Sequence, residues 1–348
     1  MASKTRKLKN KKVTIVSPAN IAFIKYWGMG DHNLFIPRNN NISMTMDGCI
    51  TTTTIEARDD IDEDEIEIKF FEKEYEKMSR DTIKRKNLYN QIDRIRDLAK
   101  SKKKVKMKSV NNFPADAGIA ASASSFSAVT AGLLLTYGLD DLYEDKKEFS
   151  RQIRLCGSGS AVRSAYGGFV ELLTGSSHKF AHAVQIADEH HWDLVDIVAI
   201  VDPEKKSVSS SSGHLLADTS PYFEARIHEM QERIKMARQA ILEKDIEKLG
   251  RCIEEDSTSM HTIMMTSKPP IYYWGPGSMR IMQDVIRWRE EDNLFSYFTL
   301  DAGPNVHVIC EAKDADEIEK RLKANEFVKW TIRNKPCAGA RIVDEHLF

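Results

Sequence analysis

Charged side chains that could act on an anionic substrate occur at three well-separated places in the chain. Lys25 lies within an aromatic and apolar run, Arg163 follows a Gly/Ser cluster, and Asp301 comes directly before Ala-Gly-Pro. Ammonium and guanidinium groups bind phosphate or carboxylate, and a carboxylate at a strand end is well placed for acid/base work. Each group also has a structural interpretation. Lys25 can extend to the surface and Asp301 can cap a turn, and the residues alone leave both readings open.

A Gly/Ser cluster at residues 156–170 places hydroxyl groups close to a guanidinium. Ser158 and Ser160 are two residues apart, and Arg163 follows three residues later. If a helix starts here, Ser160 and Arg163 share a face, because side chains three apart are neighbours on a helix surface. Neutral donors beside a guanidinium suit an oxyanion, so we interpret the cluster as a binding site for one.

A turn that leads into a helix forms the small-residue segment at 109–128. Gly118 helps to break regular structure, and the Ala/Ser run after it precedes the apolar residues 129–135, which predict a helix over 122–137. A helix N-terminus offers unpaired N–H groups and the positive end of the helix dipole, and small side chains let an anion approach the backbone. This favours a phosphate cradle. A helix chosen only for close packing remains the alternative.

The segments that must position these groups alternate between strand and helix patterns. Period-two and β-branched runs predict strands, and apolar residues at helical spacing predict amphipathic helices. One continuous apolar stripe predicts a single helix over 221–252. The mixture predicts an α+β fold. Strands are expected over 13–16, 42–55, 67–71, 105–110, 193–201, 296–301 and 328–332, and helices over 79–100, 122–137, 149–155, 221–252, 279–289 and 314–323.

Length and charge indicate a globular protein of two domains without a general affinity for nucleic acid. A chain of 348 residues with 41% hydrophobic and 30% charged residues is long for one core. The 51 basic and 52 acidic residues leave a net charge of −1, so no global positive field attracts nucleic acid. Any recognition of phosphate must therefore be local.

Neither a membrane span nor an export signal is expected. No run approaches the ~20 apolar residues that a membrane helix needs, and the basic residues 1–12 lack the apolar core of a secretory signal. We expect a cytoplasmic protein whose N-terminal tail is solvated, with a nucleic-acid-binding arm as a less favoured reading. The five cysteines are scattered and fit neither a metal-binding spacing nor a disulfide framework.

Taken together, four stretches of the chain resemble the mevalonate diphosphate decarboxylases of the GHMP kinase superfamily. They are 17–28 (SPANIAFIKYWG), 111–122 (NNFPADAGIAAS), 157–168 (GSGSAVRSAYGG) and 301–305 (DAGPN), with weaker support from Met260-His261 and 268–273. The resemblance implies a GHMP kinase-like α+β fold of two domains with the active-site cleft between them. We expect these domains to cover 1–190, which includes the phosphate loop, and 191–348. It also implies a homodimer.

The same resemblance implies roles for individual residues. In such enzymes the 3-oxygen of a phosphorylated mevalonate is phosphorylated and then lost with carbon dioxide, in isoprenoid biosynthesis. Asp301 matches the catalytic aspartate, Lys25 the lysine beside it, and Arg163 the arginine that holds the substrate carboxylate. Substrate-binding positions match Asn20, Tyr26, Trp27, Ser158, Gly159 and Ser160, and phosphate-loop positions match Gly118 and Ser122. No residue of this set is expected to bind a metal.

Departures from the family pattern lie where the substrate's 5-phosphates would bind. The family usually has a basic pair after Lys-Tyr-Trp-Gly, and this chain has Met29 and Gly30. Many members supply an arginine in the Ser-rich loop, and this chain has serines at 209–212 and then His214 after Gly213. Two cationic contacts to phosphate are therefore missing. Their loss favours a 5-monophosphate over a 5-diphosphate.

Two further departures lie in the phosphate loop and disfavour ATP. Ala121 replaces the first of two paired serines, and Asp116 brings a negative charge into the loop. The leading hypothesis is therefore a decarboxylase of mevalonate 3,5-bisphosphate that forms isopentenyl phosphate and needs no cofactor. The main alternative is a phosphomevalonate or diphosphomevalonate decarboxylase that uses ATP and magnesium. A pure 3-kinase and a non-catalytic phosphate-binding paralogue are less favoured.

Overall fold

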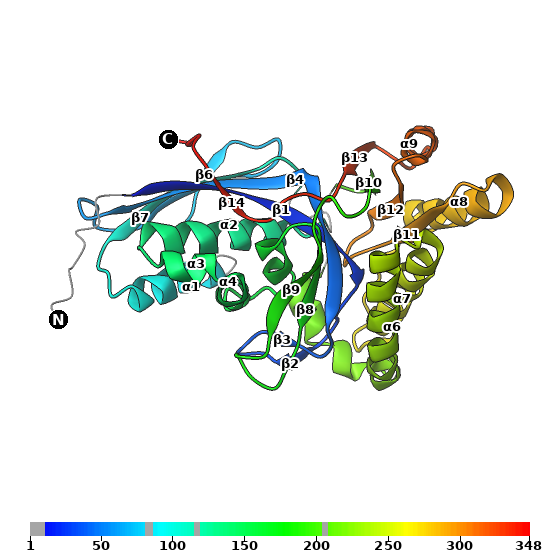
Figure 1. Cartoon of the computed structure of the whole chain (residues 1–348), viewed down its shortest axis with the longest axis horizontal. Helices are drawn as coiled ribbons and strands as arrows, with labels where there is room; N and C mark the ends of the chain where they lie inside the picture. Colours follow the sequence, from blue (N-terminus) through cyan, green and yellow to red (C-terminus); the bar gives the residue numbers. More distant parts are fainter. Residues whose placement is uncertain (1–10, 81–85, 115–118, 204–207) are drawn as a thin grey trace.

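Two large, mainly antiparallel sheets with helices packed against them form most of the protein, and β2 and β3 form a small third sheet (Figure 1). The computed structural model describes residues 11–80, 86–114, 119–203 and 208–348. The larger sheet has eight strands in the order β14-β1-β4-β7-β5-β6, with β8 paired to β4 and β9 to β8. Their bounds are β1 (Lys12–Ile24), β4 (Asn41–Arg58), β5 (Glu65–Lys69), β6 (Tyr75–Lys77), β7 (Lys104–Asn111), β8 (Phe169–Leu173), β9 (His182–Ala187) and β14 (Arg341–Val343).

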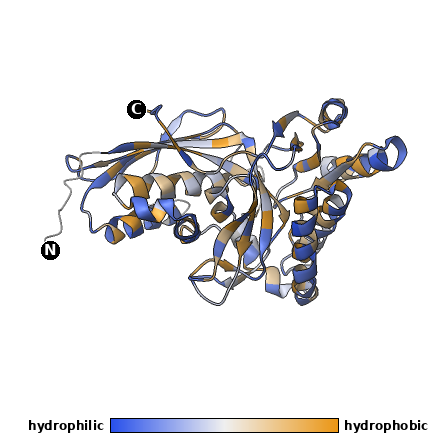
Figure 2. Cartoon of the chain, viewed as in Figure 1, coloured by the Kyte–Doolittle hydropathy of each residue, from blue (hydrophilic) through white to orange (hydrophobic). Residues whose placement is uncertain are grey.

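Helices from the first half of the chain cover one face of this sheet. They are α1 (Lys86–Leu98), α2 (Ala121–Thr136), α3 (Asp140–Glu144) and α4 (Lys146–Arg154). Helix α2 has no charged residue, and Figure 2 shows little blue along it. Its leucines pack on Ile15 of β1 and Ile55 of β4, so the hydrophobic effect fixes α2 beneath the two longest strands. The start of α2 is thereby held against the middle of the sheet.

The smaller sheet carries helices on both faces. Its order is β11-β12-β10-β13, with β10 (Leu194–Ile200), β11 (Ser296–Thr299), β12 (Val306–Glu311) and β13 (Trp330–Asn334). Helices α8 (Pro276–Asp292) and α9 (Ala315–Lys323) pack on Val195 and Ile197 of β10. Helices α6 (Phe223–Glu243) and α7 (Ile246–Thr266) cover the other face, and their core continues to Ile21 and Phe23 of β1. One hydrophobic core thus joins the two halves of the protein.

The predicted α+β class is confirmed, and most predicted elements occur close to their expected places. Helix α2 begins and ends one residue before the predicted bounds of 122 and 137. The single helix predicted over 221–252 is wrong: the chain forms α6 and α7 with a sharp break between them. Lys244 adopts a left-handed φ of 58°, and the side chain of Asp245 accepts the N–H of Lys248 as an N-cap. The apolar stripe continues across this break, which is why periodicity missed it.

Strand β1 is longer than predicted, and its extension reaches the site. The predicted strand 13–16 continues to Ile24, through residues that the sequence marked as a candidate site. Strand β14 pairs with β1, so the end of the chain joins the larger sheet. The division at residue 190 stays a prediction.

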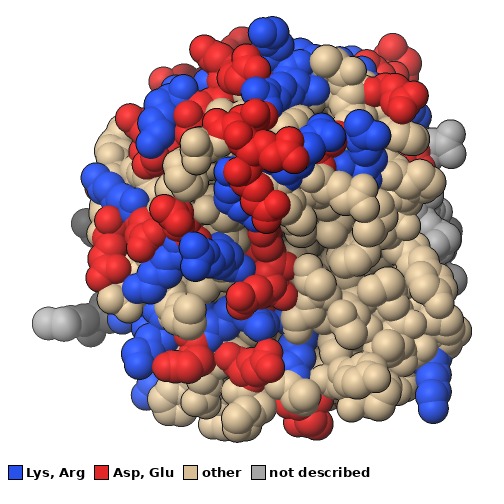
Figure 3. All heavy atoms as spheres, turned by 90° about the vertical axis from the view of Figure 1, so that its right-hand side faces the viewer, with Lys and Arg blue, Asp and Glu red and all other residues tan. Residues whose placement is uncertain are grey.

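The remaining short elements are β2 (Met29–Asp31), β3 (Ile36–Pro37), η2 (Ala161–Ala165), α5 (Ser210–His214) and η3 (Ala217–Thr219). Within the described ranges, no helix combines the length and the apolarity that crossing a membrane requires. Figure 3 shows acidic and basic side chains interleaved over the charged part of the face that lies on the right in Figure 1. Pairs such as Arg233–Glu229 on α6 and Arg251–Glu247 on α7 account for such mixing along these helices.

Candidate active site

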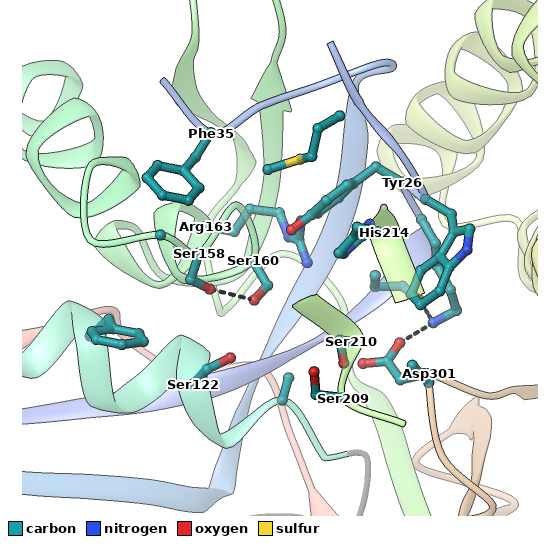
Figure 4. A pocket seen from close by; sticks show the side chains of 18 of the residues that line it. Tyr26, Phe35, Ser122, Ser158, Ser160, Arg163, Ser209, Ser210, His214 and Asp301 are labelled. Carbon is teal, nitrogen blue, oxygen red and sulfur yellow. Dashed lines mark hydrogen bonds and ion pairs between the residues drawn. The ribbon is translucent and has the colours of Figure 1, made fainter. Parts of the chain in front are cut away.

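A cavity of about 450 Å³ lies where the two halves of the protein meet (Figure 4). Its walls come from the end of β1, the β2–β3 hairpin, the starts of α1 and α2, the segment before and within η2, α5, α7 and the turn after β11. Eight of the predicted catalytic, substrate-binding and phosphate-loop residues line it: Lys25, Tyr26, Trp27, Ser122, Ser158, Ser160, Arg163 and Asp301. Segments more than 270 residues apart in the sequence therefore share one cavity.

Lys25 and Asp301 form an ion pair in this cavity. The Lys25 Nζ lies 2.5 Å from Asp301 Oδ1 and donates a second hydrogen bond to the carbonyl of Ala22 at 2.7 Å. The Lys25 side chain is only 3% exposed and that of Asp301 is 20% exposed. Lys25 therefore does not extend to the surface, and Asp301 keeps one side open to the cavity.

The surroundings of Asp301 keep its carboxylate ionised. Burial raises the pKa of Asp301, but the positive charge of Lys25, followed by His307 and Arg163, outweighs burial and lowers the pKa below its ordinary value. The turn after Asp301 is closed by the backbone, with Gly303 N–H donating to the Asp301 carbonyl at 2.8 Å. The side chain is thus engaged with Lys25 rather than capping the turn.

Arg163 is a buried cation whose partners are all neutral in the described part of the chain. It lies on η2 and is 2% exposed. Its guanidinium donates to Asn20 Oδ1 at 2.9 and 3.2 Å, to Ser43 Oγ at 2.8 Å, and to Asn41 Oδ1. Burial lowers the pKa of Arg163 to about 10, so it remains charged at neutral pH. A fixed guanidinium without a bound carboxylate is well suited to receive one from a ligand.

Asn20 and Gly159 lie next to the lining residues rather than among them. Asn20 is buried behind Arg163 and also donates to the carbonyl of Ser160 at 3.1 Å, so it orients both groups. A side chain at position 159 would lie 2.7 Å from the Tyr26 hydroxyl, so glycine lets the tyrosine approach the backbone. We expect both residues to act on a ligand through their neighbours.

Hydroxyl groups surround the open side of the cavity. The Oγ atoms of Ser158 and Ser160 are 3.0 Å apart (Figure 4). Ser122 is exposed in the first turn of α2, whose N-cap residue Ala120 makes no side-chain cap and adopts a left-handed φ of 49°. The N-terminus of α2 therefore faces the cavity as the phosphate-cradle reading requires. Gly118 and Asp116 lie outside the described residues.

Three adjacent aromatic rings, those of Tyr26, Trp27 and His214, line the cavity. The ring of His214 lies parallel to that of Tyr26, with centroids 4.8 Å apart, and tilts against Trp27 at 4.4 Å. Its Nδ1 accepts the backbone N–H of Gly28 at 3.1 Å, so this nitrogen carries no proton. His214 therefore places an aromatic ring where many members of the family have an arginine.

The sequence did not single out Asn41 and Ser43, which hold Arg163. Both lie on β4, where buried polar residues at 41, 43 and 45 alternate with Ile42 and Met44. A strand with one apolar and one polar face, both buried, indicates that the polar face meets a buried polar partner. The sequence shows the alternation but not the burial of the polar face, so the pattern alone indicates an ordinary half-buried strand.

The described residues contain no group of three or more His, Cys, Asp or Glu side chains arranged to hold a metal ion. All five cysteines are free thiols. Among the described residues, the groups that the cavity offers for chemistry include one ionised carboxylate, two cations, hydroxyl groups and a helix N-terminus.

Comparisons with known proteins agree with this arrangement. A family model described as a diphosphomevalonate decarboxylase-like N-terminal domain matches residues 17–183, and one described as a mevalonate 5-diphosphate decarboxylase C-terminal domain matches 196–337. The diphosphomevalonate decarboxylase of Candida albicans is 33% identical over 88% of this chain and 86% of its own length. That of Danio rerio is 36% identical over 87% of this chain and 76% of its own.

Solved structures show the same fold over almost the whole chain. The mevalonate diphosphate decarboxylase of Staphylococcus aureus has a TM-score of 0.88 and 32% identity, covering 97% of this chain and 99% of its own. The enzyme of Enterococcus faecalis, whose structure is described as showing ATP binding mediated by mevalonate diphosphate, has a TM-score of 0.84 and 28% identity over 96% and 99%. The chain therefore belongs to the diphosphomevalonate decarboxylase family, a family of carboxy-lyases.

Proposed function

We propose that this chain decarboxylates a mevalonate phosphorylated at its 5-position, by expelling phosphate from the 3-position together with carbon dioxide. The observation that carries the proposal is the convergence of Lys25, Asp301 and Arg163 on one cavity. This set provides a binding group for the substrate carboxylate and a negative charge near the carbon that loses phosphate.

Each of the three charged side chains has its own role in the reaction. Departure of the 3-phosphate leaves positive charge on a tertiary carbon, and the ionised carboxylate of Asp301 stabilises that charge. Arg163 holds the substrate carboxylate so that its C–C bond is aligned with the emptying orbital. The electrons of that bond then form the new double bond as carbon dioxide leaves. Lys25 keeps Asp301 ionised and in place.

For the source of the 3-phosphate, the comparisons support ATP better than the ATP-free route that the sequence favoured. The relatives carry the name diphosphomevalonate decarboxylase, and a related solved complex contains MVAPP, AMPPCP and magnesium. The N-terminus of α2, whose N-cap residue Ala120 makes no side-chain cap, opens on the same cavity and offers N–H groups to a nucleotide phosphate. Magnesium would arrive with the nucleotide, because Mg²⁺ usually keeps substrate phosphates as ligands, and the exposed hydroxyl of Ser122 suits a contact there.

A second candidate, the ATP-free decarboxylation of mevalonate 3,5-bisphosphate, draws support from the lining of the cavity. Among its described residues the only Lys or Arg side chains are Lys25 and Arg163, and Lys25 is neutralised by Asp301. Met29, His32 and His214 also line it, and none of them is a lysine or an arginine. This favours a 5-monophosphate over a 5-diphosphate. Ala121 also supplies no hydroxyl to a nucleotide.

A substrate panel tests the proposal and separates the two candidates. Mevalonate 5-phosphate, 5-diphosphate and 3,5-bisphosphate are each incubated with the full chain, with and without MgATP, and carbon dioxide, ADP and phosphate are measured. We expect carbon dioxide and ADP in equal amounts with MgATP, with the 5-monophosphate preferred over the 5-diphosphate. Turnover of the bisphosphate alone, without ADP from any substrate, would establish the ATP-free reaction instead. No turnover of any substrate would reject both.

The pH dependence tests the role of Lys25. The pKa of Asp301 is lowered in the folded protein, so the pair stabilises the fold above the ordinary aspartate pKa, and this contribution is lost as the pH falls. Activity should therefore persist below the ordinary pKa of an aspartate. In Lys25→Gln the acid limb of kcat/KM should move to higher pH by roughly one to three units.

The control for this experiment is Lys108→Gln. Lys108 Nζ lies 2.9 Å from Glu67 Oε2, and neither residue lines the cavity, so this variant breaks an ion pair elsewhere in the protein. Its pH profile should match that of the unchanged protein. Identical acid limbs in the two variants would show that Lys25 does not set the ionisation of Asp301.

A further inference from the structure

The ion pair in the cavity is attached, through its backbone, to one turn of helix α7. Lys25 follows the last residue of β1, so its N–H and C=O groups lie beyond the strand ladder and, being buried, need other partners. The N–H donates to Asp256 Oδ2 at 2.8 Å. The C=O accepts from Arg226 Nη2 at 3.1 Å and from Asn39 Nδ2 at 3.1 Å. Two helices from the second half of the chain thus hold the backbone of Lys25.

Asp256 and Arg226 form a closed ring with that backbone. Arg226 Nη2 donates to Asp256 Oδ1 at 2.9 Å, and Arg226 Nη1 donates to the Asp256 carbonyl at 3.1 Å. Both side chains are almost fully buried. A buried ion pair that also bonds to a neighbouring backbone restricts the position of that backbone, because a displacement breaks several hydrogen bonds together.

The next residue of α7 holds the other partner of the pair. Ser257 is buried, accepts the N–H of Leu300 at 3.0 Å, and lies 3.3 Å from the Leu300 carbonyl, to which its hydroxyl donates. Leu300 is bonded directly to Asp301. Consecutive residues of one helix therefore hold the backbone beside Asp301 and the backbone of Lys25.

We propose that Asp256 and Ser257 are positioning residues that fix the separation of the Lys25 ammonium and the Asp301 carboxylate. The inference rests on the proposed function. Lys25 comes from the larger sheet and Asp301 from the smaller one, so nothing local to either strand sets their distance. A rigid helical turn that contacts both backbones supplies that distance. Charge interactions weaken with separation. An increase of about 1 Å in the distance between the Lys25 ammonium and the Asp301 carboxylate would therefore lower kcat by up to roughly a hundredfold.

Ser257→Ala tests this with little change in volume. The variant loses both bonds to Leu300 and touches neither the cavity nor the ion pair. We expect kcat to fall by about ten- to a hundredfold with KM changed less than about threefold, because positioning acts on the reacting groups more than on ground-state binding. The acid limb of the pH profile should shift upward as Lys25 loosens from Asp301.

Ser150→Ala is the matched control. Ser150 is equally buried, accepts the N–H of Ala183 at 2.9 Å, donates to the Lys147 carbonyl at 2.7 Å, and lies on α4 outside the cavity lining. A structural role alone would lower the melting temperature in both variants without changing kcat or the pH profile. Equal kinetics in the two variants would overturn the proposal.

A second measurement keeps the inference testable without turnover. The ¹³C resonance of the Asp301 carboxyl, assigned with Asp301→Asn, is followed by NMR during a pH titration of the unchanged protein, Ser257→Ala and Ser150→Ala. We expect an upward shift of the midpoint only in Ser257→Ala. If the substrate panel shows no turnover but the midpoint shifts in this way, the proposed function fails and the positioning role stands. An unchanged midpoint overturns the positioning role even if the enzyme is active.

Discussion

Replacing Asp301 with asparagine is expected to lower kcat by about a thousandfold while KM changes little. Asparagine has the same shape and keeps an oxygen 2.5 Å from the Lys25 ammonium, so the cavity and the fold should survive. What disappears is the negative charge that faces a carbon as it becomes positive. Because that charge matters only after the phosphate begins to leave, its loss should appear in kcat rather than in substrate binding.

Steady-state release of carbon dioxide, together with the melting temperature, measures this effect. Asp284→Asn is the matched control, since Asp284 is also a buried aspartate with cationic neighbours, Arg280 at 2.9 Å and Arg287 at 2.7 Å, but lies on α8 away from the cavity. That variant should lose stability and retain kcat. An Asp301→Asn enzyme with nearly full kcat would remove the carboxylate from the mechanism and leave the proposal without its charge-stabilising group.

The sequence was most informative where residue type and order agreed with a family pattern. Lys25, Arg163 and Asp301 were each ambiguous alone, because a lysine can reach the surface and an aspartate can cap a turn. The structure decides both cases through a long-range contact, the Lys25–Asp301 pair. Local patterns carry no information on such contacts, so only the resemblance over the four stretches predicted that these residues share a cavity.

The parts of the site that the sequence missed depend on packing between distant elements. Asp256 and Ser257 lie in an amphipathic helix and look like ordinary polar positions, and their partners are 231 and 43 residues away in the chain. The break between α6 and α7 was missed for a related reason. The buried stripe is continuous in sequence, and a single lysine in a left-handed conformation followed by an N-capping aspartate ends one helix and starts the next.

A second large effect is expected at Arg163, where Arg163→Gln should lower kcat by about a hundredfold and raise KM by less than about tenfold. Glutamine is preferable to glutamate here because Asn20 and Asn41 point their carbonyl oxygens at this position and would repel a carboxylate. The guanidinium's main contribution is alignment. It holds the substrate carboxylate so that the breaking C–C bond overlaps the orbital that the departing phosphate empties, and a misaligned substrate can still bind.

Arg154→Gln separates this role from the cost of altering any buried arginine. Arg154 is fully buried and bonds to the carbonyls of Ala181 and Leu34 and to His178. It does not itself line the cavity, and burial lowers its pKa to about 10, as it does that of Arg163. Both variants should melt at lower temperature, since each leaves buried acceptors unpaired. Only in Arg163→Gln should kcat for decarboxylation fall by a larger factor than the affinity for the ligand, which is measured by calorimetry. If kcat falls equally in both variants, the loss reflects a weakened fold, and the carboxylate of the substrate must be held by another group.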